Sequence, residues 1–118
     1  MKESLLQQVE RKLKWATYNG RVTFNEKNSV VIVSKDYTYC ITPQNKLAVY
    51  AFNIHSVGMW RDKEAAEIYA NNLIARNGKG KLIEFVVVPY LELKKWTAEK
   101  LQPIVEIIRN TDLATIQN

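Results

Sequence analysis

Residues 30–42 read VVIVSKDYTYCIT, and this stretch decides the fold. Its first four residues are apolar on both faces, which is typical of an interior strand. Ser34, Lys35 and Asp36 favour a turn, and the segment 37–42 then alternates large side chains with small or polar ones. The stretch therefore predicts two neighbouring antiparallel strands.

Further strands are predicted on both sides of this pair. Residues 21–24 alternate and are followed by the turn-forming residues 25–28, which predicts a hairpin. Beyond the pair, residues 43–45, Pro-Gln-Asn, favour another turn, and the segment 46–52 has the composition of a fourth strand. The expected product is an antiparallel meander of four strands.

Two helices are predicted around this meander. Residues 3–17 place their apolar side chains at the three-and-four spacing of one helical face. A second helix is expected after Asp62, a favourable N-cap, and is expected to end at the pair Asn77-Gly78, because both residues tolerate a left-handed backbone.

The last third of the chain predicts one more strand and one more helix. The strand covers residues 81–88 and ends at Pro89. Thr97 is expected to cap the last helix, and Pro103 removes a backbone donor inside it, so we expect a kink or a restart there. Residues 111–118 are expected to form a frayed tail.

The order helix, four strands, helix, strand, helix predicts an α+β fold with a mainly antiparallel sheet of about five strands. We expect the helices to pack on one face of this sheet, because an antiparallel sheet can leave its other face in water. A length of 118 residues predicts a single domain that spans residues 1–118.

The composition is that of a folded, modestly basic protein. Apolar residues make up 47% of the chain and charged residues 25%, which excludes a disordered chain. The net charge of +5 permits nucleic-acid or acidic protein partners, although such a charge can also serve solubility alone. The single cysteine, Cys40, excludes an internal disulfide. With neither a signal peptide nor a membrane-spanning run, we expect a cytoplasmic protein without membrane contact.

The sequence contains no recognisable catalytic or metal site. Its only histidine, His55, has no Ser, Cys or Asp pattern around it that matches a catalytic triad. Structural zinc needs about four Cys or His ligands, whereas His55 and Cys40 are the only two, so we expect neither a metal nor a cofactor. An enzyme would require a cleft that unites His55, Glu84 and a tyrosine.

The loop predicted at residues 54–61 offers the main candidate binding site. Met59, Trp60 and Arg61 follow one another there, and Trp, Arg and Met are enriched at protein interfaces. We therefore expect a small non-enzymatic binding protein that contacts another protein through this loop and the adjoining second helix, and self-association as a homodimer stays open. The alternative is that Trp60 only packs over the first turn of the second helix.

The alternative function is that of a basic nucleic-acid-binding domain. The first helix interleaves cations with Trp15 and Tyr18, and aromatic rings can stack on bases. The segment 77–81, Asn-Gly-Lys-Gly-Lys, adds two lysines but lacks the spacing of a P-loop. The residues predicted to contact nucleic acid are Arg11, Lys12, Lys14, Arg21, Lys79 and Lys81. Against this, the aromatic rings can simply close the core while the cations solvate the helix.

Residues 37–88 resemble a module found in many small phage and prophage proteins, with a strand hairpin, a helix start Asp-Lys-Glu-Ala-Ala-Glu and a Val-rich strand. The resemblance covers under half of the chain and includes no motif of an activity. It implies an accessory protein of a mobile element, for example an inhibitor that blocks a host defence enzyme by binding it.

Overall fold

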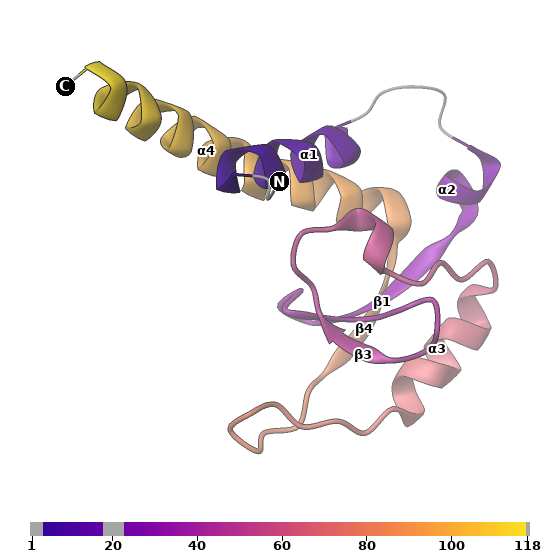
Figure 1. Cartoon of the computed structure of the whole chain (residues 1–118). Coiled ribbons are helices and arrows are strands. Elements are labelled where there is room, and N and C mark those ends of the chain that lie inside the picture. The colour runs from indigo at the N-terminus through magenta and orange to yellow at the C-terminus, as the bar shows by residue number, and fades with distance from the viewer. Residues whose placement is uncertain (1–3, 18–22, 118) are drawn as a thin grey trace.

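The computed structural model describes residues 4–17 and 23–117, the last six of them as backbone only, and it is an α+β fold (Figure 1). The helices are α1 (Leu5–Thr17), α2 (Phe24–Asn28), the short 3-10 helix η1 (Ile54–Ser56), α3 (Lys63–Asn72) and α4 (Tyr90–Gln117). The strands are β1 (Val30–Ser34), β2 (Tyr39–Ile41), β3 (Leu47–Val49) and β4 (Phe85–Pro89). The α+β class is confirmed, with four strands among the described residues rather than five.

The strands form one antiparallel sheet in the order β3-β2-β1-β4. β1 pairs with β4 along its whole length, from Val30 opposite Pro89 to Ser34 opposite Phe85. On its other side β1 pairs with β2, and β2 pairs with β3. The last strand of the chain therefore lies beside the first, and β4 forms one edge of this sheet while β3 forms the other.

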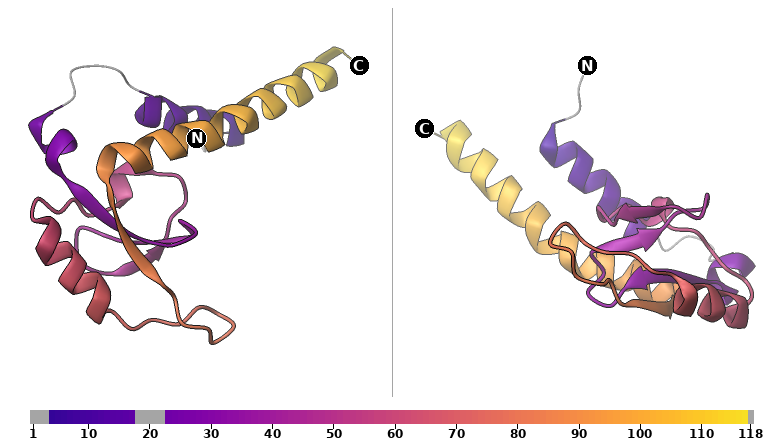
Figure 2. Two further views of the ribbon diagram at one scale, coloured as in Figure 1. Left: turned by 180° about the vertical axis from the view of Figure 1, so that it is seen from behind. Right: turned by 90° about the horizontal axis from the view of Figure 1, so that it is seen from below.

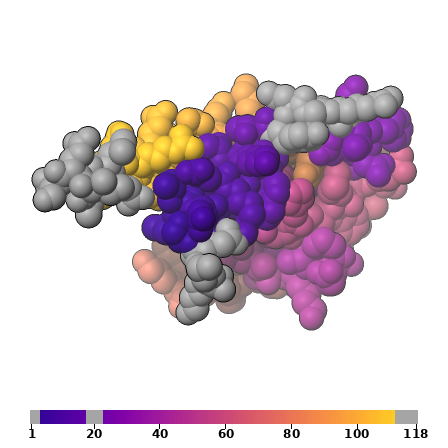
Figure 3. Space-filling view, turned by 45° about the horizontal axis from the view of Figure 1, so that its top comes forward, coloured from indigo at the N-terminus to yellow at the C-terminus, as the bar shows by residue number. Residues whose placement is uncertain are grey.

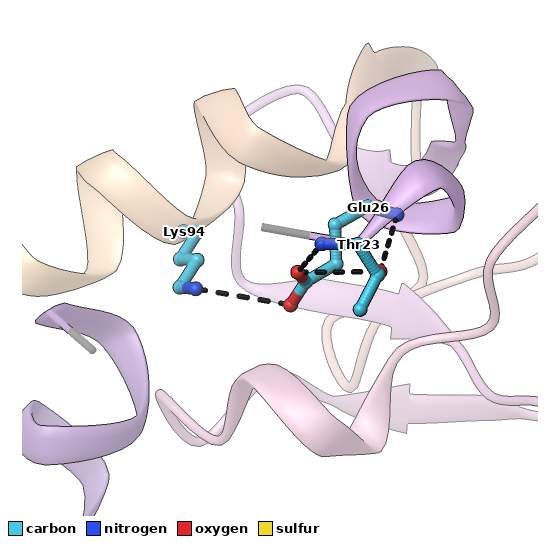
Figure 4. A network of polar contacts seen from close by, with 3 residues as sticks. All are labelled: Thr23, Glu26 and Lys94. Carbon is cyan, nitrogen blue, oxygen red and sulfur yellow. Dashed lines mark hydrogen bonds and ion pairs between the residues drawn. The ribbon is translucent and has the colours of Figure 1, made fainter. Parts of the chain in front are cut away.

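The strand predicted at residues 21–24 accounts for the difference in strand number. Residues 21 and 22 lie outside the described residues, and Phe24 begins α2. Thr23 and Glu26 form a capping box, in which Thr23 Oγ1 accepts from the Glu26 N–H (3.1 Å) and Glu26 Oε2 accepts from the Thr23 N–H (2.9 Å). Glu26 Oε1 also lies 3.8 Å from Nζ of Lys94 on α4 (Figure 4). The cap and its contact with α4 stabilise a helix at a segment whose alternation suggested a strand.

Helices cover both faces of the sheet, which corrects the prediction that they pack on one face (Figure 2). Val31 and Val33 join a buried cluster with Leu93 of α4, whereas Ile32 joins a second cluster with Ala66 of α3. Successive residues of a strand point to opposite faces. A strand that is apolar at every position therefore has to be covered on both.

Asp62 caps α3 as predicted, because its Oδ1 accepts from the Ala65 N–H at 3.2 Å. The helix ends at Asn72, however, rather than at the pair Asn77-Gly78. The chain beyond it forms a two-stranded ribbon, which we call the 74–83 hairpin. This ribbon is closed by a β-bridge between Arg76 and Leu82.

The side chain of Asn77 explains why this pair forms a turn and does not end a helix. Its Oδ1 accepts from the backbone N–H of Lys79 at 2.9 Å and of Lys81 at 3.1 Å. Asn side chains that bond the following backbone favour turns. The predicted strand at 81–88 is correspondingly shorter, since β4 begins only at Phe85.

α4 begins at Tyr90, directly after β4, so the prediction that Thr97 caps the last helix is wrong. Thr97 is fully buried inside the helix, where its Oγ1 donates to the Leu93 carbonyl (2.8 Å) and lies 2.6 Å from the Tyr50 hydroxyl. The buried side chains of α4 follow one face: Tyr90, Leu93, Thr97, Leu101 and Val105. Pro103 lies within the helix, whose backbone continues through residues 111–117.

α1 runs antiparallel to α4 and packs along it (Figures 1 and 2). Ala16 is buried, and the half-buried Trp15 packs against the cluster beneath α4. Nε of Arg109 lies 3.3 Å from Oε1 of Glu10, which joins the two helices. A space-filling view shows α1 across this side of the molecule with α4 emerging beside it (Figure 3).

Candidate binding surface

Trp60 is held in place by the backbone of β1. Its N–H donates to the Val30 carbonyl and its carbonyl accepts from the Val30 N–H, both at 2.8 Å. The pair forms an antiparallel bridge just beyond the end of β2. The segment around Trp60, predicted as a loop, is thus an irregular extension of the sheet, which directs the indole toward α3.

Gly58 allows this path. Its N–H donates to the Ile41 carbonyl at 2.8 Å, so that the chain passes close to the end of β2. A Cβ atom at position 58 would lie 2.8 Å from the carbonyl oxygen of Thr42, closer than real Cβ contacts. The approach that positions Trp60 therefore requires a residue without a side chain.

The indole of Trp60 forms one wall of a hollow that we call the α3 groove. The Trp60 and Tyr69 rings lie 5.3 Å apart between centroids, tilted by 41°. The hollow has a volume of about 460 Å³. Its lining residues are Trp60, Ala65, Ile68, Tyr69, Asn72 and Leu73. A groove with this lining suits an apolar side chain of a partner.

The inner face of α3 explains why the groove is open. Ala66 and Ala70 face the sheet and are buried against Ile32 and Ile41. Such small residues fill little of the space beside them, so Trp60 and Tyr69 close the layer only partly. Ile68 lies on the outer side, with 62% of its surface exposed, and contributes nothing to that buried cluster.

Of the three predicted contact residues, only Trp60 lines the α3 groove. Met59 is exposed beside it. The Arg61 guanidinium lies 5.1 Å from the ring centroid of Phe24, which is itself exposed on α2. Arg61 therefore extends the surface toward α2 and away from the groove.

The residues predicted to contact nucleic acid fall into two separate groups. Arg11, Lys12 and Lys14 lie on α1, where the Arg11 guanidinium is 5.3 Å from the Trp15 ring centroid. Lys79 and Lys81 lie in the 74–83 hairpin, at the opposite end of the sheet from α1 (Figures 1 and 2). Arg21 and Tyr18 fall outside the described residues. The structure does not unite the cations it describes in one surface.

His55 and Glu84 do not share a site. His55 is exposed on η1, with its ring 4.7 Å from the Trp15 ring in an edge-to-face arrangement. The Glu84 carboxylate lies 3.6 Å from Nζ of Lys35 and lines a polar hollow of about 280 Å³, whose lining includes Tyr39 but not His55. Among residues 4–17 and 23–117, no three His, Cys, Asp or Glu side chains are placed to hold a metal ion.

The polar hollow next to Glu84 lies over the turn between β1 and β2. Ser34 Oγ donates to Asp36 Oδ1 at 2.8 Å and accepts from the Tyr39 N–H at 2.9 Å. The hydrogen bond from Ser34 lowers the pKa of Asp36, which keeps this carboxylate charged. The Asp36 carboxylate thus stabilises the turn between β1 and β2.

The second helix was predicted as part of the contact, but none of its residues was named, and Ile68 is the one that the sequence analysis missed. The buried face of this helix was predicted from Ala66, Tyr69, Ala70, Leu73 and Ile74. Ile74 lies beyond the end of α3 and is exposed, and Ile68 does not belong to the predicted set. An apolar residue on the polar face of an amphipathic helix is a recognisable signal of a contact surface. The pairing of Trp60 with Val30, in contrast, leaves no signal in the local sequence.

Comparison of the chain with protein-family models, with curated proteins and with solved structures gives no match. Within the described part of the chain, no helix has the length and apolar character needed to cross a membrane.

Proposed function

We propose that this chain is a non-enzymatic binding protein that recognises another protein through the α3 groove. The observation that carries the proposal is the groove itself, which places the aromatic rings of Trp60 and Tyr69 beside the exposed side chain of Ile68. Aromatic anchors around a hollow that excludes water are the usual energetic centre of a protein interface.

The lining of the groove supports a protein partner over a small molecule. It is mostly apolar, with Asn72 and the polar tips of Trp60 and Tyr69 as its polar side-chain groups. A mostly apolar hollow on an exposed helix is typical of the centre of a protein interface. We expect the partner to insert an apolar side chain between Trp60 and Ile68.

The class of partner follows from the resemblance of residues 37–88 to phage and prophage modules, which stays a prediction. It makes an enzyme of host defence the first partner to test. This chain would inhibit such an enzyme if the enzyme's side chain that enters the α3 groove belonged to a surface that the enzyme uses for its activity.

The test compares wild-type protein with Ile68→Asp in capture of proteins from an extract of the native host. Ile68 is exposed, so the substitution places a charge in the groove without emptying the core. The control is Val49→Asp on β3, because Val49 has a similar exposed fraction, 64%, and lies outside the groove. We expect a partner that is retained by the wild type and the control and is lost from Ile68→Asp.

A partner that all three proteins retain equally would contradict the α3 groove as its site. Trp60→Ala is expected to give the same loss as Ile68→Asp, but it also removes a ring that packs against the cluster of Ile32 and Ile41. Arg61→Ala tests the extension toward α2. Unchanged capture by Arg61→Ala would confine the contact to the groove.

The 74–83 hairpin favours nucleic acid as a second candidate partner. Residues 68–83 contain Arg76, Lys79 and Lys81 and no acidic residue. Ile74 is 83% exposed, and Leu82 on the facing strand is also exposed. A two-stranded ribbon fits the major groove of DNA, and cations along it can contact phosphates.

Titration of a labelled DNA duplex tests this candidate. Binding through the hairpin is expected to weaken steeply between about 50 and 200 mM salt, because phosphate contacts release counterions. Lys79→Gln with Lys81→Gln should reduce the affinity, whereas Arg11→Gln with Lys14→Gln on α1 should not. Absence of binding at low salt, or a loss confined to the α1 variant, would exclude the hairpin.

A further inference from the structure

The end of the α1–α4 pair carries an apolar surface with no cover among the described residues. α4 is 28 residues long and α1 is 13. At about 1.5 Å per residue, the lengths are about 42 Å and about 20 Å. Much of α4 therefore lies beyond the sheet, with α1 as its neighbour (Figure 1). A long helix of a globular protein is normally stabilised by packing along its apolar face.

Apolar side chains gather where the two helices diverge from the sheet. Leu5 is 66% exposed on α1 and Ile107 is 64% exposed on α4. Both line a hollow of about 310 Å³ between the helices. We call Leu5, Leu6, Ile104, Ile107 and Ile108 the helix-pair patch. Ile104, Ile107 and Ile108 share one face of α4 because they are three and four residues apart.

The helix-pair patch is free of charge, although the chain carries a net charge of +5. The residues that line its hollow are Ser4, Leu5, Leu6, Ile107, Ile108 and Thr111, and none of them is ionisable. The nearest ion pair known to join the helices, Arg109 with Glu10, is neutral as a pair.

We propose that the helix-pair patch binds a second copy of this chain, so that two α1–α4 pairs form a four-helix bundle. In a two-fold contact the same patch of each copy faces the other, so a patch with a net charge would repel itself, whereas an uncharged apolar patch does not. Two basic chains also approach each other best through the part of their surface that carries no net charge. Antiparallel helix pairs associate readily into such bundles.

The size of the patch sets the strength of the dimer. Two helices side by side are about 20 Å wide, and residues 104–111 of α4 extend for about 12 Å, so the patch offers a footprint of about a few hundred Å² per copy. Interfaces that bury less than about 1,200 Å² in total are weak or transient. We therefore expect a reversible dimer with a dissociation constant in the micromolar range, visible only at higher concentration.

Sedimentation velocity of the full chain at concentrations from about 1 to 300 μM, which brackets the micromolar range, tests the proposal. The wild type is expected to shift from monomer to dimer across this range. Leu5→Asp and Ile107→Asp should each remain monomeric, because both would bury like charges at the two-fold contact. Both positions are exposed, so circular dichroism should show an unchanged fold.

Ile68→Asp is the matched control, since Ile68 is exposed to the same extent in the α3 groove, and it should dimerise like the wild type. A wild type that stays monomeric at the highest concentration would overturn the proposal and leave the patch to a different protein. A dimer that persists in both Leu5→Asp and Ile107→Asp, or is lost in Ile68→Asp, would also overturn it. Each outcome is independent of partner capture by the α3 groove.

Discussion

The face of the sheet beneath α4 is closed by large side chains, whereas the face beneath α3 is closed in part by alanines. Beneath α4, Leu93 and Tyr50 are buried with Val31 and Val33. Beneath α3, the helix contributes Ala66 and Ala70, and the half-buried rings of Trp60 and Tyr69 complete the layer. Large side chains therefore fill the face beneath α4, whereas the face beneath α3 keeps an open groove.

Two residues with a strained backbone also lie on the face beneath α4. Phe52 and Tyr37 both have left-handed backbones, with φ of 61°. Their rings contact Trp96 of α4, with centroids at 5.6 Å in a stacked arrangement for Phe52 and at 4.8 Å edge-on for Tyr37. Such backbones cost about 1 kcal/mol or more each for residues other than glycine. The aromatic packing around Trp96 has to offset that cost, which marks this cluster as part of the stability of the fold.

The largest expected effect tests whether the α4 face carries the stability. Leu93 is fully buried, so Leu93→Ala should lower the free energy of unfolding by about 2 to 5 kcal/mol through lost burial and the cavity left behind. Urea denaturation measures this change. Ile104→Ala on the same helix is the control, because Ile104 is partly exposed and should lose clearly less. A loss below about 1 kcal/mol for Leu93→Ala would break the comparison.

The pH dependence of stability tests the α4 face at a single buried residue, Tyr50. Burial raises the pKa of Tyr50 to about 12, while its hydrogen bond with Thr97 acts in the opposite direction. The folded state thus favours the neutral phenol, and this contribution is complete below pH 10, the usual pKa, and is lost as the pH rises from 10 to 12. Stability should fall over that window by an amount on the order of 2 kcal/mol.

Tyr50→Phe should reduce the alkaline loss, although the pKa values of Tyr37, Cys40 and Tyr90 are also raised by burial, so part of it should remain. Urea midpoints at pH 8 and pH 11 measure both proteins. If the two lost stability equally between these pH values, Tyr50 would not be the group responsible.

A smaller effect is expected where α2 is anchored to α4. Thr23→Ala removes the cap of α2, which should cost about 1 kcal/mol of unfolding free energy. Thr23→Ser keeps a capping hydroxyl and should be close to the wild type. Thermal melting of both variants measures the difference. Equal melting temperatures for Ala and Ser would show that the capping box adds little to the fold.

The smallest effect is expected on the open face. Ile68→Asp should change the free energy of unfolding by no more than about 0.5 kcal/mol, because the side chain lies outside the buried cluster beneath α3. The same urea experiment measures it. A loss comparable to that of Leu93→Ala would show that the outer side of α3 belongs to the core, and the two faces would no longer differ in kind.

Much of the sheet and the start of α3 could be predicted from the sequence. The apolar run at Val30, the turn at Asp36 and the cap at Asp62 are local signals, and each corresponds to a feature of the structure. The uniformly apolar strand at 30–33 even indicated that both of its faces are covered. The prediction that all helices pack on one face was therefore inconsistent with this strand.

Other features had signals that pointed two ways. Thr23 and Glu26 have the spacing of a capping box, but the alternation of residues 21–24 favoured a strand. In α4, Tyr90, Leu93 and Thr97 already follow the helical spacing, yet a threonine is also a common N-cap. Burial against Tyr50 decided the role of Thr97, and that contact joins residues far apart in the sequence.

The candidate site was predictable only in part. Trp60 was predicted as a contact residue from its type, and its place in the α3 groove depends on long-range pairing with Val30. Its proposed role stays a prediction. The two groups of cations could not be separated in advance, because only the fold places α1 and the 74–83 hairpin at opposite ends of the sheet.

The close approach of Gly58 to Thr42 sets a rule for anyone who remodels this protein as a binding scaffold. Positions 65, 68 and 72 can be varied to recognise new targets, since α3 holds them by its own backbone. Position 58 has to stay glycine, because any larger residue there would push the indole-bearing segment off β2. A Cβ atom added at position 58 would therefore change the shape of the groove in every variant made at positions 65, 68 and 72.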